Sequence, residues 1–312
     1  MILSASRRTD IPNYYSDWFY QRIKEGYCYV RNPMNAHQIS KISLSPEVVD
    51  CIVFWTKNPA PMMTHLPELK DYRYYFQFTL TGYGRDIEPN VPRKKESAIP
   101  TFQSLSREIG KEKVIWRYDP ILFTEKYTME YHLFAFSQIA EALCGYTDKC
   151  VISFVDIYAK NRKTMERLWL QVFPEEKLKE FAGKLSRIAR GHQMEIAACA
   201  EAMDLSDCGI SPNSCIDKGQ IEKIIGCKLR GAKDKNQRGE CGCMESVEIG
   251  AYDTCKNGCL YCYANQSDVQ VRSKAELYDV NSPLLCGTVT EQDKITERKM
   301  KSLREEQLSF FE

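Results

Sequence analysis

We predict an α/β fold for this chain, a partial (β/α) barrel of the TIM type, from two features of its sequence. Short apolar, β-rich runs recur along the chain, and most of them are followed by polar residues and then by helical sequence. This alternation indicates a parallel sheet covered by helices, closed or nearly closed into a barrel. A length of 312 residues suits one such barrel, although two domains would also fit.

The predicted strands are seven short apolar segments: Ile2–Ser6, Cys51–Trp55, Tyr75–Leu80, Val114–Trp116, Val151–Val155, Glu195–Ala198 and Val247–Tyr252. Polar residues follow most of them, among them Asp10, Lys57, Thr79, Arg117, Asp156 and Glu201. In a parallel barrel the carboxyl ends of the strands open onto one face, where the chemistry is usually found. Any single one of these residues could instead be a helix cap or a loop contact, but six of them on one face indicate a site.

Three amphipathic segments are predicted as helices. Ile11–Glu25 has Asp10 as its N-cap, a proline in its first turn and a glycine directly after it. Thr128–Cys144 and Pro174–Arg190 each place apolar residues on one helical face.

We expect four parts along the chain: a barrel body over 1–200, a cysteine-containing linker over 201–245, a closing strand and cysteine loop over 246–264, and a polar tail over 265–312. The basic, glycine-containing stretch 228–245 is interpreted as a solvated loop in preference to a phosphate-binding patch. In the tail, Glu291–Gln307 is predicted as an exposed helix, and Leu308–Phe311 could dock back on the body.

Composition narrows the class of protein. The net charge of +1 gives no general attraction to nucleic acid or to an acidic membrane. The N-terminus has no export signal and no apolar run approaches 18 residues, so we expect a soluble, cytoplasmic protein that does not span a membrane.

The chain contains fourteen cysteines and only four histidines. Disulfides are disfavoured in the reducing cytosol. Five cysteines stand singly, mostly among apolar neighbours, and are interpreted as buried thiols: Cys28, Cys51, Cys144, Cys150 and Cys286. The other nine lie between Cys199 and Cys262, and this clustering indicates metal binding.

Three cysteines form a compact loop, Cys255, Cys259 and Cys262, in the segment C-K-N-G-C-L-Y-C. Iron–sulfur clusters are usually held by four cysteine thiolates. Three thiolates at this spacing can hold three irons of a [4Fe–4S] cluster, and the fourth iron then remains open to a substrate or cofactor. The alternatives are a structural zinc site, a disulfide and a chance match to the pattern.

This spacing, with an aromatic residue before the last cysteine, resembles the signature of the radical S-adenosylmethionine superfamily. The resemblance implies that the open iron chelates S-adenosylmethionine. One electron then cleaves the sulfonium to methionine and a 5′-deoxyadenosyl radical, which abstracts hydrogen from a substrate. It also implies that Tyr261 lies against the adenine.

Over nearly its whole length the chain resembles an uncharacterised bacterial and archaeal family known as a domain of unknown function, which carries its C-x3-C-x2-C cluster near the C-terminus. The shared segments are S-x-R-R-T-D-I-P, V-F-W-T-K-N-P, W-R-Y-D-P-I, C-A-E, C-I-D, K-N-Q-R-x-x-C-x-C and G-A-Y-D-T-C-K-N-G-C-L-Y-C-Y-A.

A weaker similarity is to the spore photoproduct lyase-like branch of the superfamily, in which the cluster loop comes first. Here the loop comes last, which implies a circularly permuted barrel whose first and last strands are neighbours. By this analogy Lys57 pairs with the S-adenosylmethionine carboxylate, and Asp10 and Thr79 lie near its ribose or amine. Arg7, Arg8 and Arg117 are further candidates for binding carboxylates or phosphates, and one or two of these cations would hold S-adenosylmethionine.

A second set of four cysteines, Cys199, Cys215, Cys241 and Cys243, falls in the family-like segments. We predict that they hold an auxiliary iron–sulfur cluster. A tetrahedral zinc site and plain buried thiols are the alternatives. Cys208 and Cys227 stand in ordinary helix or loop sequence.

The predicted function is therefore that of a radical S-adenosylmethionine enzyme with an unknown substrate, reduced by a donor such as flavodoxin or ferredoxin. Two alternatives remain: a zinc-stabilised nucleic-acid-binding protein that uses the basic stretch 228–238, and a non-radical iron–sulfur electron carrier.

Overall fold

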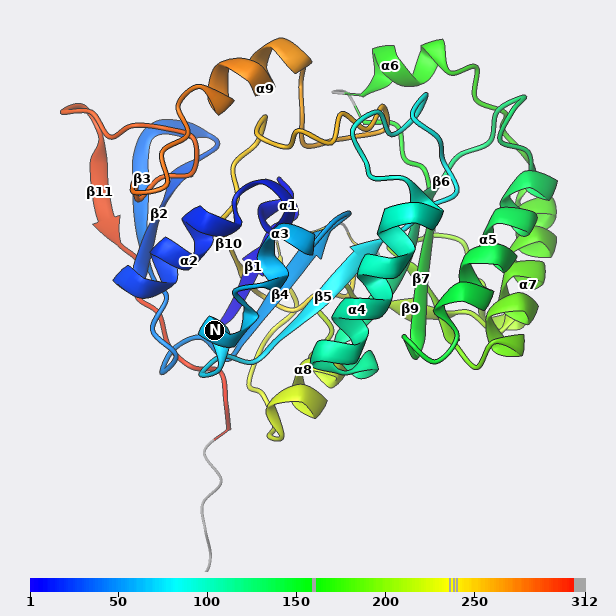
Figure 1. Ribbon diagram of the computed structural model, residues 1–312, viewed down its shortest axis with the longest axis horizontal. Helices are drawn as coiled ribbons and strands as arrows, with labels where there is room; N and C mark the ends of the chain where they lie inside the picture. The colour runs from blue at the N-terminus through cyan, green and yellow to red at the C-terminus, as the bar shows by residue number, and fades with distance from the viewer. Residues whose placement is uncertain (159–160, 236, 238, 240, 306–312) are drawn as a thin grey trace, which may run out of the picture.

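The computed structural model describes residues 1–158, 161–235, 237, 239 and 241–305. Its main element is an eight-stranded sheet in which every neighbouring pair is parallel (Figure 1). In spatial order the strands are β10 (Val247–Glu248), β1 (Ile2–Ala5), β4 (Cys51–Thr56), β5 (Tyr74–Thr79), β6 (Val114–Ile121), β7 (Lys149–Phe154), β8 (Glu195–Cys199) and β9 (Ser211–Asn213). All seven predicted strands thus have a counterpart in the sheet, although the last, Val247–Tyr252, is a strand only over Val247–Glu248.

The sheet is open over the described residues, which agrees with the predicted partial (β/α) arrangement and not with a closed barrel. Its two edge strands, β9 and β10, are the shortest, with three and two residues, and they pair only on one side. The first and last strands of the sheet in chain order are neighbours, as predicted: β10 pairs with β1 through Leu3–Val247 and Ser4–Glu248. The circular permutation stays a prediction.

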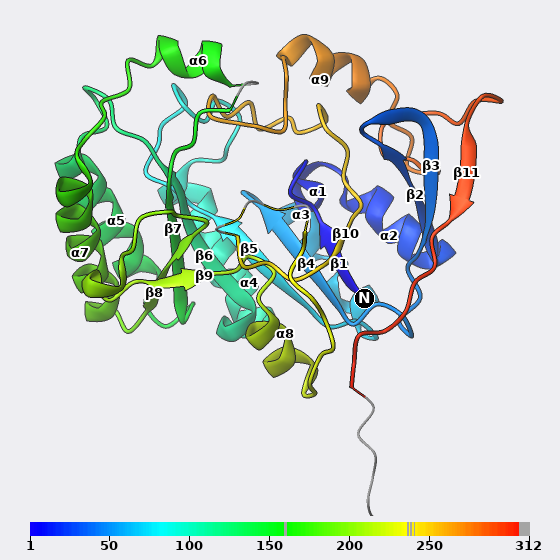
Figure 2. The same ribbon diagram turned by 180° about the vertical axis from the view of Figure 1, so that it is seen from behind.

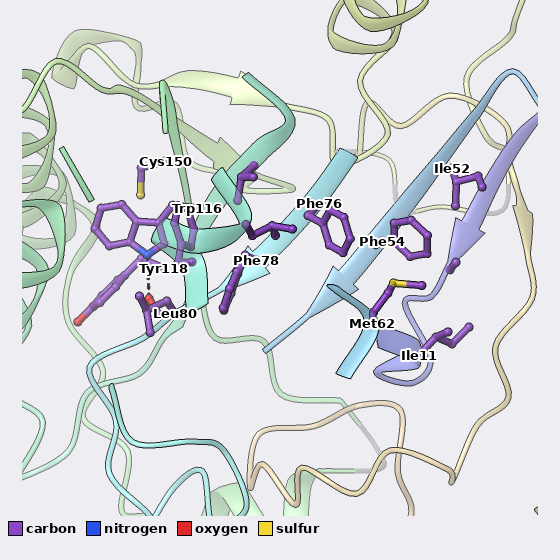
Figure 3. Packing of buried hydrophobic residues seen from close by; sticks show 14 of the residues in the cluster. Ile11, Ile52, Phe54, Met62, Phe76, Phe78, Leu80, Trp116, Tyr118 and Cys150 are labelled. Atoms are coloured by element: carbon purple, nitrogen blue, oxygen red, sulfur yellow. Dashed lines mark hydrogen bonds between the residues drawn. The ribbon is translucent and has the colours of Figure 1, made fainter. Parts of the chain in front are cut away.

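Helices cover the outer face of the sheet. They are α1 (Ile11–Tyr14), α2 (Ser16–Glu25), α3 (Ala60–Met63), α4 (Ile99–Ile109), α5 (Met129–Leu143) and α7 (Glu175–Gly191). Because side chains alternate along a strand, one set of strand residues faces these helices, including Phe54, Phe76 and Trp116 (Figure 3). The rings of Phe54 and Phe76 lie 4.8 Å apart across β4 and β5. Burial of each such side chain contributes roughly 1.5–3 kcal/mol.

The inner face of the sheet is covered by the segment around α8 (Lys218–Ile225) and the chain that follows it, as Figure 2 shows. The inward strand residues Ile2, Val53 and Tyr75 form one apolar cluster with residues of this segment, which include Cys215, Leu229, Cys243 and Met244. The segment 228–245 is thus a loop whose charged residues are mostly exposed, as interpreted, but whose apolar residues, Leu229, Cys241, Cys243 and Met244, are buried in the residues described. Its apolar members fill the space that an inner layer of barrel side chains would otherwise occupy.

The predicted helix Ile11–Glu25 is interrupted at Tyr15, which separates α1 from α2. Tyr15 is fully buried, and its hydroxyl donates to the carbonyl of Thr254 at 2.6 Å. This contact explains the break, since an aromatic side chain anchored on another segment overrides the local helical pattern. The other two predicted helices are confirmed as α5, with Thr128 as N-cap, and α7.

A second, three-stranded sheet was not predicted. It contains β2 (Tyr27–Asn32), β3 (Asn35–Ser43) and β11 (Lys294–Glu297). The predicted helix Glu291–Gln307 is thus wrong over its described part, because Lys294–Glu297 pairs in parallel with β3 and Leu303 N donates to Asp50 at 2.7 Å. Gln307 and the segment Leu308–Phe311 lie outside the described residues.

Two further helices, α6 (Arg162–Arg167) and α9 (Asp268–Ala275), lie at the top of Figure 1, above the carboxyl ends of the strands. Of the five cysteines interpreted as buried thiols, Cys144 is exposed at the end of α5, so that interpretation is wrong for it; the other four are buried. Within the described residues no helix is long and apolar enough to cross a membrane.

We expect stability to fall between pH 6.5 and pH 4 because of His132. This residue of α5 is fully buried, its ring contacts the Tyr118 hydroxyl and the Leu122 carbonyl, and burial lowers its pKa to about 4. Below pH 6.5 the histidine is protonated in the unfolded chain but stays neutral in the folded protein. This difference lowers the free energy of unfolding by up to about 3 kcal/mol at pH 4. Urea unfolding across this pH range should show a smaller loss of stability in His132→Gln than in the wild-type protein. The same pH profile in both proteins would contradict this assignment.

Candidate functional site

A cavity of about 440 Å³ lies where the strands of the main sheet end. Its lining includes all seven cysteines predicted to bind metal: Cys199, Cys215, Cys241, Cys243, Cys255, Cys259 and Cys262. It also includes all six residues predicted to contact the cofactor: Arg8, Asp10, Lys57, Thr79, Arg117 and Tyr261. Residues from the two ends of the chain are thus brought to one site.

The three-cysteine loop is held tightly against the carboxyl end of β1 and the segment after β5. A Cβ atom on Gly250 would lie 1.9 Å from Ser6 Oγ, so only glycine allows this approach of the two chains. Gly258 has a φ of +69°, the left-handed conformation that turns the loop between its first two cysteines. Asn90 Nδ2 donates to the Lys256 carbonyl at 2.7 Å. These contacts fix the path of the loop without using the thiols.

The thiols of this loop stand in a partly desolvated environment. Burial raises the pKa of Cys259 to about 12 and also raises the pKa of Cys255 and Cys262. Cys262 Sγ accepts a hydrogen bond from Ala264 N at 3.3 Å. A bound cation reverses such pKa shifts because it stabilises the thiolate. Among the residues described, no three Cys, His, Asp or Glu side chains are grouped so that they could hold a metal ion.

Asp10 links the loop to two strand ends. Its carboxylate accepts hydrogen bonds from Asn13 N, Lys57 N and Asn257 Nδ2, at 3.2, 2.8 and 3.0 Å. Asp10 is 4% exposed and caps α1. Its predicted contact with S-adenosylmethionine stays a prediction, but these three donors already occupy the carboxylate, which indicates a role in positioning the loop.

Lys57 belongs to a buried charge network that the sequence did not indicate. Its ammonium lies 2.7 Å from Glu88, which also binds Lys94 and accepts a hydrogen bond from the Tyr261 hydroxyl. Burial alone would raise the pKa of Glu88, but Lys57 and Lys94 outweigh it and lower that pKa to about 2. Glu88 therefore neutralises Lys57 and holds Tyr261 at the edge of the cavity. Nothing in the local sequence marked Glu88, which lies in a loop well after β5.

The arginines after β1 differ in how far their charge is satisfied. Arg7 has Asp234 and Glu248 within 4 Å. Arg8 is half-buried over the ring of Tyr252, and no carboxylate lies within ion-pair distance of it in the described part of the chain. The hydroxyl of the neighbouring Thr9 is buried and has no hydrogen-bond partner there. Both residues line the cavity, so they offer a cation and a polar group to a ligand.

The four cysteines of the second set all line the cavity, and their predicted role as ligands of an auxiliary cluster stays a prediction. The sulfur atoms of Cys199 and Cys215 lie 2.9 Å apart, and the thiols of Cys215, Cys243 and Cys241 form a hydrogen-bonded series. Hydrogen bonds from the neighbouring thiols, followed by the charge of Arg117, lower the pKa of Cys215.

Arg117 contacts the second cysteine set. Its Nη1 donates to Cys215 Sγ at 3.1 Å, and its Nε donates to Asp119 at 2.9 Å. Its predicted contact with S-adenosylmethionine stays a prediction. Thr79, the last residue of β5, lines the cavity, whereas Cys208 and Cys227 are absent from the lining in the residues described.

Comparison with known proteins gives a family without an assigned activity. A family model described as a domain of unknown function (DUF1848) matches residues 2–264. No curated protein matches the chain. Among solved structures, the crystal structure of a putative α-L-fucosidase from Bacteroides thetaiotaomicron is similar at 10% identity and a TM-score of 0.26, over 70% of this chain and 82% of that one.

Proposed function

We propose that this chain, which belongs to the DUF1848 family of unknown function, is a radical S-adenosylmethionine enzyme acting on an unknown substrate. The observation that carries the proposal is that Cys255, Cys259 and Cys262 line one cavity together with strand-end cations and Tyr261. Three thiolates fit a [4Fe–4S] cluster with one iron open. When bound, this cluster would supply the electron that cleaves S-adenosylmethionine to methionine and a hydrogen-abstracting 5′-deoxyadenosyl radical.

The residues of the chain suit this group in three ways. Ala264 N donates to Cys262 Sγ, the type of hydrogen bond that tunes the reduction potential of clusters. The Tyr261 ring is held by Glu88 beside the loop and offers a face for stacking. In the part of the chain that the structure describes, Arg8 has no carboxylate within ion-pair distance and the Thr9 hydroxyl has no hydrogen-bond partner, so the two offer a cation and a polar group to a ligand. Delivery of the electron is assigned to a donor protein such as flavodoxin or ferredoxin.

Anaerobic reconstitution tests the proposal. The full chain is loaded with iron and sulfide and incubated with S-adenosylmethionine and dithionite, and 5′-deoxyadenosine and methionine are measured by chromatography. We expect both products and a brown protein. A brown, iron-loaded protein that forms neither product would be an electron carrier, and a colourless protein that binds only zinc would support the nucleic-acid-binding alternative.

We expect Arg8 to bind the carboxylate of S-adenosylmethionine. A buried carboxylate needs a charged partner, and a charge-assisted hydrogen bond contributes about 1.5–3 kcal/mol. Arg8→Gln should therefore raise the Kd of S-adenosylmethionine roughly 10- to 100-fold. Equilibrium binding at matched iron loading measures the effect.

Lys57→Met is the comparison for this prediction. Lys57, which the sequence analogy pairs with the carboxylate, is already neutralised by Glu88. Its loss should therefore weaken S-adenosylmethionine binding less than the loss of Arg8. A larger effect of Lys57→Met at unchanged iron content would return the carboxylate contact to Lys57.

A further inference from the structure

We infer that Cys199, Cys215, Cys241 and Cys243 form a second iron–sulfur site, with Arg117 as a fixed cation hydrogen-bonded to one of its sulfurs. The inference goes beyond the proposed function, which requires only the three-cysteine loop. It rests on contacts of the described residues and holds whether or not the first site cleaves S-adenosylmethionine.

Three segments of the chain bring these sulfurs to one cavity. Cys199 ends β8, Cys215 follows β9, and Cys241 and Cys243 lie just before β10. Cys199 and Cys215 are in direct sulfur contact at 2.9 Å, and Cys243 bonds to both Cys215 and Cys241. Cys28 and Cys150 are separate buried thiols of the outer apolar cluster, whereas Cys215, Cys241 and Cys243 lie together in the inner one. Four thiols on one cavity match the number of ligands of a [4Fe–4S] cluster, although in the described residues no three of them are grouped to hold a single metal ion.

Cys215 is positioned by polar groups of the sheet interior. Its carbonyl accepts from the Tyr75 hydroxyl at 2.7 Å and from Gln77 Nε2 at 2.9 Å. Tyr75 and Gln77 are buried inward-facing residues of β5. Backbone donors complete the arrangement, since Ile216 N donates to Cys243 Sγ at 3.3 Å. Buried polar side chains that hold one cysteine in this way orient a ligand, which is the usual role of groups behind a metal site.

Arg117 adds a positive charge at the sulfurs. Its side chain is 5% exposed, and its guanidinium bridges Cys215 Sγ, Gln77 and Asp119. A buried guanidinium is costly unless it is paired, and Asp119 alone would serve that purpose. The additional bond to sulfur places the charge where negative charge of a thiolate-bound cluster is concentrated. Hydrogen bonds and charge near the sulfurs set the potential of such clusters.

The position of the site favours iron–sulfur over structural zinc. All four cysteines line the cavity that also contains the three-cysteine loop. Structural zinc contributes to folding and needs no access to a reaction space, whereas a redox centre beside the three-cysteine loop can exchange electrons with a cluster there. We therefore assign an iron–sulfur cluster to the second set.

Metal analysis of the Cys255→Ala/Cys259→Ala/Cys262→Ala variant tests the assignment. After anaerobic reconstitution this variant should retain roughly half of the wild-type iron and sulfide, about four of eight irons. Further replacement of Cys215 and Cys241 by alanine should remove the remainder. The pair Cys208→Ala/Cys227→Ala, in the same region but outside the cavity lining, should leave the iron content unchanged. One zinc in place of the residual iron, or no metal, would overturn the assignment.

Potentiometry with electron paramagnetic resonance tests the role of Arg117 in the same triple variant. Arg117→Met should shift the midpoint potential of the remaining cluster to a more negative value, because a positive charge favours the reduced state. Asp119→Asn removes a negative charge from the same pair and should shift it in the opposite direction. Equal potentials in both variants, with circular dichroism unchanged, would refute the role of the cation.

These measurements separate the two proposals. Residual iron in the triple variant together with wild-type protein that makes no 5′-deoxyadenosine would leave the second site standing and remove the proposed function. If the wild-type protein makes 5′-deoxyadenosine but its triple variant retains no iron, the proposed function stands and the second site does not.

Discussion

Replacing Cys255, Cys259 and Cys262 together by alanine is expected to abolish formation of 5′-deoxyadenosine. The three thiols are the proposed anchors of the cluster that leaves an iron open, and cleavage requires that open iron. The loop itself should stay in place, because Asn90 binds the Lys256 carbonyl and Leu260 N donates to the Ile87 carbonyl without any thiol. Chromatography of the reaction mixture measures the product, and circular dichroism measures the fold.

The Cys208→Ala/Cys227→Ala pair is the matched control for this experiment, since it removes thiols of intermediate exposure from outside the cavity lining. It should retain wild-type turnover at equal iron content. A triple variant that still makes 5′-deoxyadenosine above the level of cluster-free protein would show that the cluster assignment is wrong.

Strand positions could be predicted because the main sheet is covered on both faces. Cys51–Thr56 and Tyr74–Thr79 are therefore almost continuously apolar, and such runs are distinctive. The small sheet escaped prediction for the opposite reason. Asn35–Ser43 is mostly polar, and its partner Lys294–Glu297 is supplied by the far end of the chain, so its pairing depends on tertiary contacts that no local pattern records.

The linker 228–245 shows how composition can mislead. Its lysines and glycines suggested a solvated loop, but in such a stretch a few apolar residues decide the placement. Leu229, Cys243 and Met244 are buried against inward-facing residues of the sheet, while the charged residues between them remain largely at the surface. Hydrophobic burial requires only one face of an irregular segment, and irregular segments have no period by which that face could be recognised.

The cysteines that line the candidate site could be chosen from the sequence better than the partners of its charged residues. Cysteines at a characteristic spacing can be recognised in the sequence alone, and all seven cysteines chosen in this way line one cavity. Charges carry no such information, because an ion pair depends on where a distant carboxylate lies. The sequence therefore could not show that Lys57 lies beside Glu88 or that Arg117 donates to Cys215, and the predicted contacts of both cations with S-adenosylmethionine stay predictions.

Among the single substitutions that we propose, Glu88→Gln is expected to lower the free energy of unfolding the most. Its side chain is 1% exposed and lies 2.7 Å from Lys57 and 2.6 Å from Lys94. Removing one partner of a buried ion pair leaves uncompensated charge and costs about 3–5 kcal/mol. We expect the low end for Glu88→Gln, about 3 kcal/mol, because the two lysines are 11% and 20% exposed. Urea unfolding at pH 7 measures this loss.

The pH dependence gives a second measure of the same interaction. The pKa of Glu88 is about 2 in the folded protein, below its ordinary value of 4.5, so the folded protein binds the proton less readily than the unfolded chain. The contribution of Glu88 is therefore complete above pH 4.5 and disappears as the pH falls toward 2. The Glu88→Gln variant should lack this part of the loss of stability at acidic pH.

Glu180→Gln is the matched control for Glu88→Gln, since Glu180 also lies 2.7 Å from a lysine, Lys184, but the pair is exposed on α7. Exposed pairs contribute about 0.2–1 kcal/mol, so this substitution should have little effect. Adding Lys57→Met to Glu88→Gln removes one of the stranded charges and should recover part of the stability. If Glu88→Gln proved no more destabilising than Glu180→Gln, the buried network would not be what holds Tyr261 and Lys57 at the cavity.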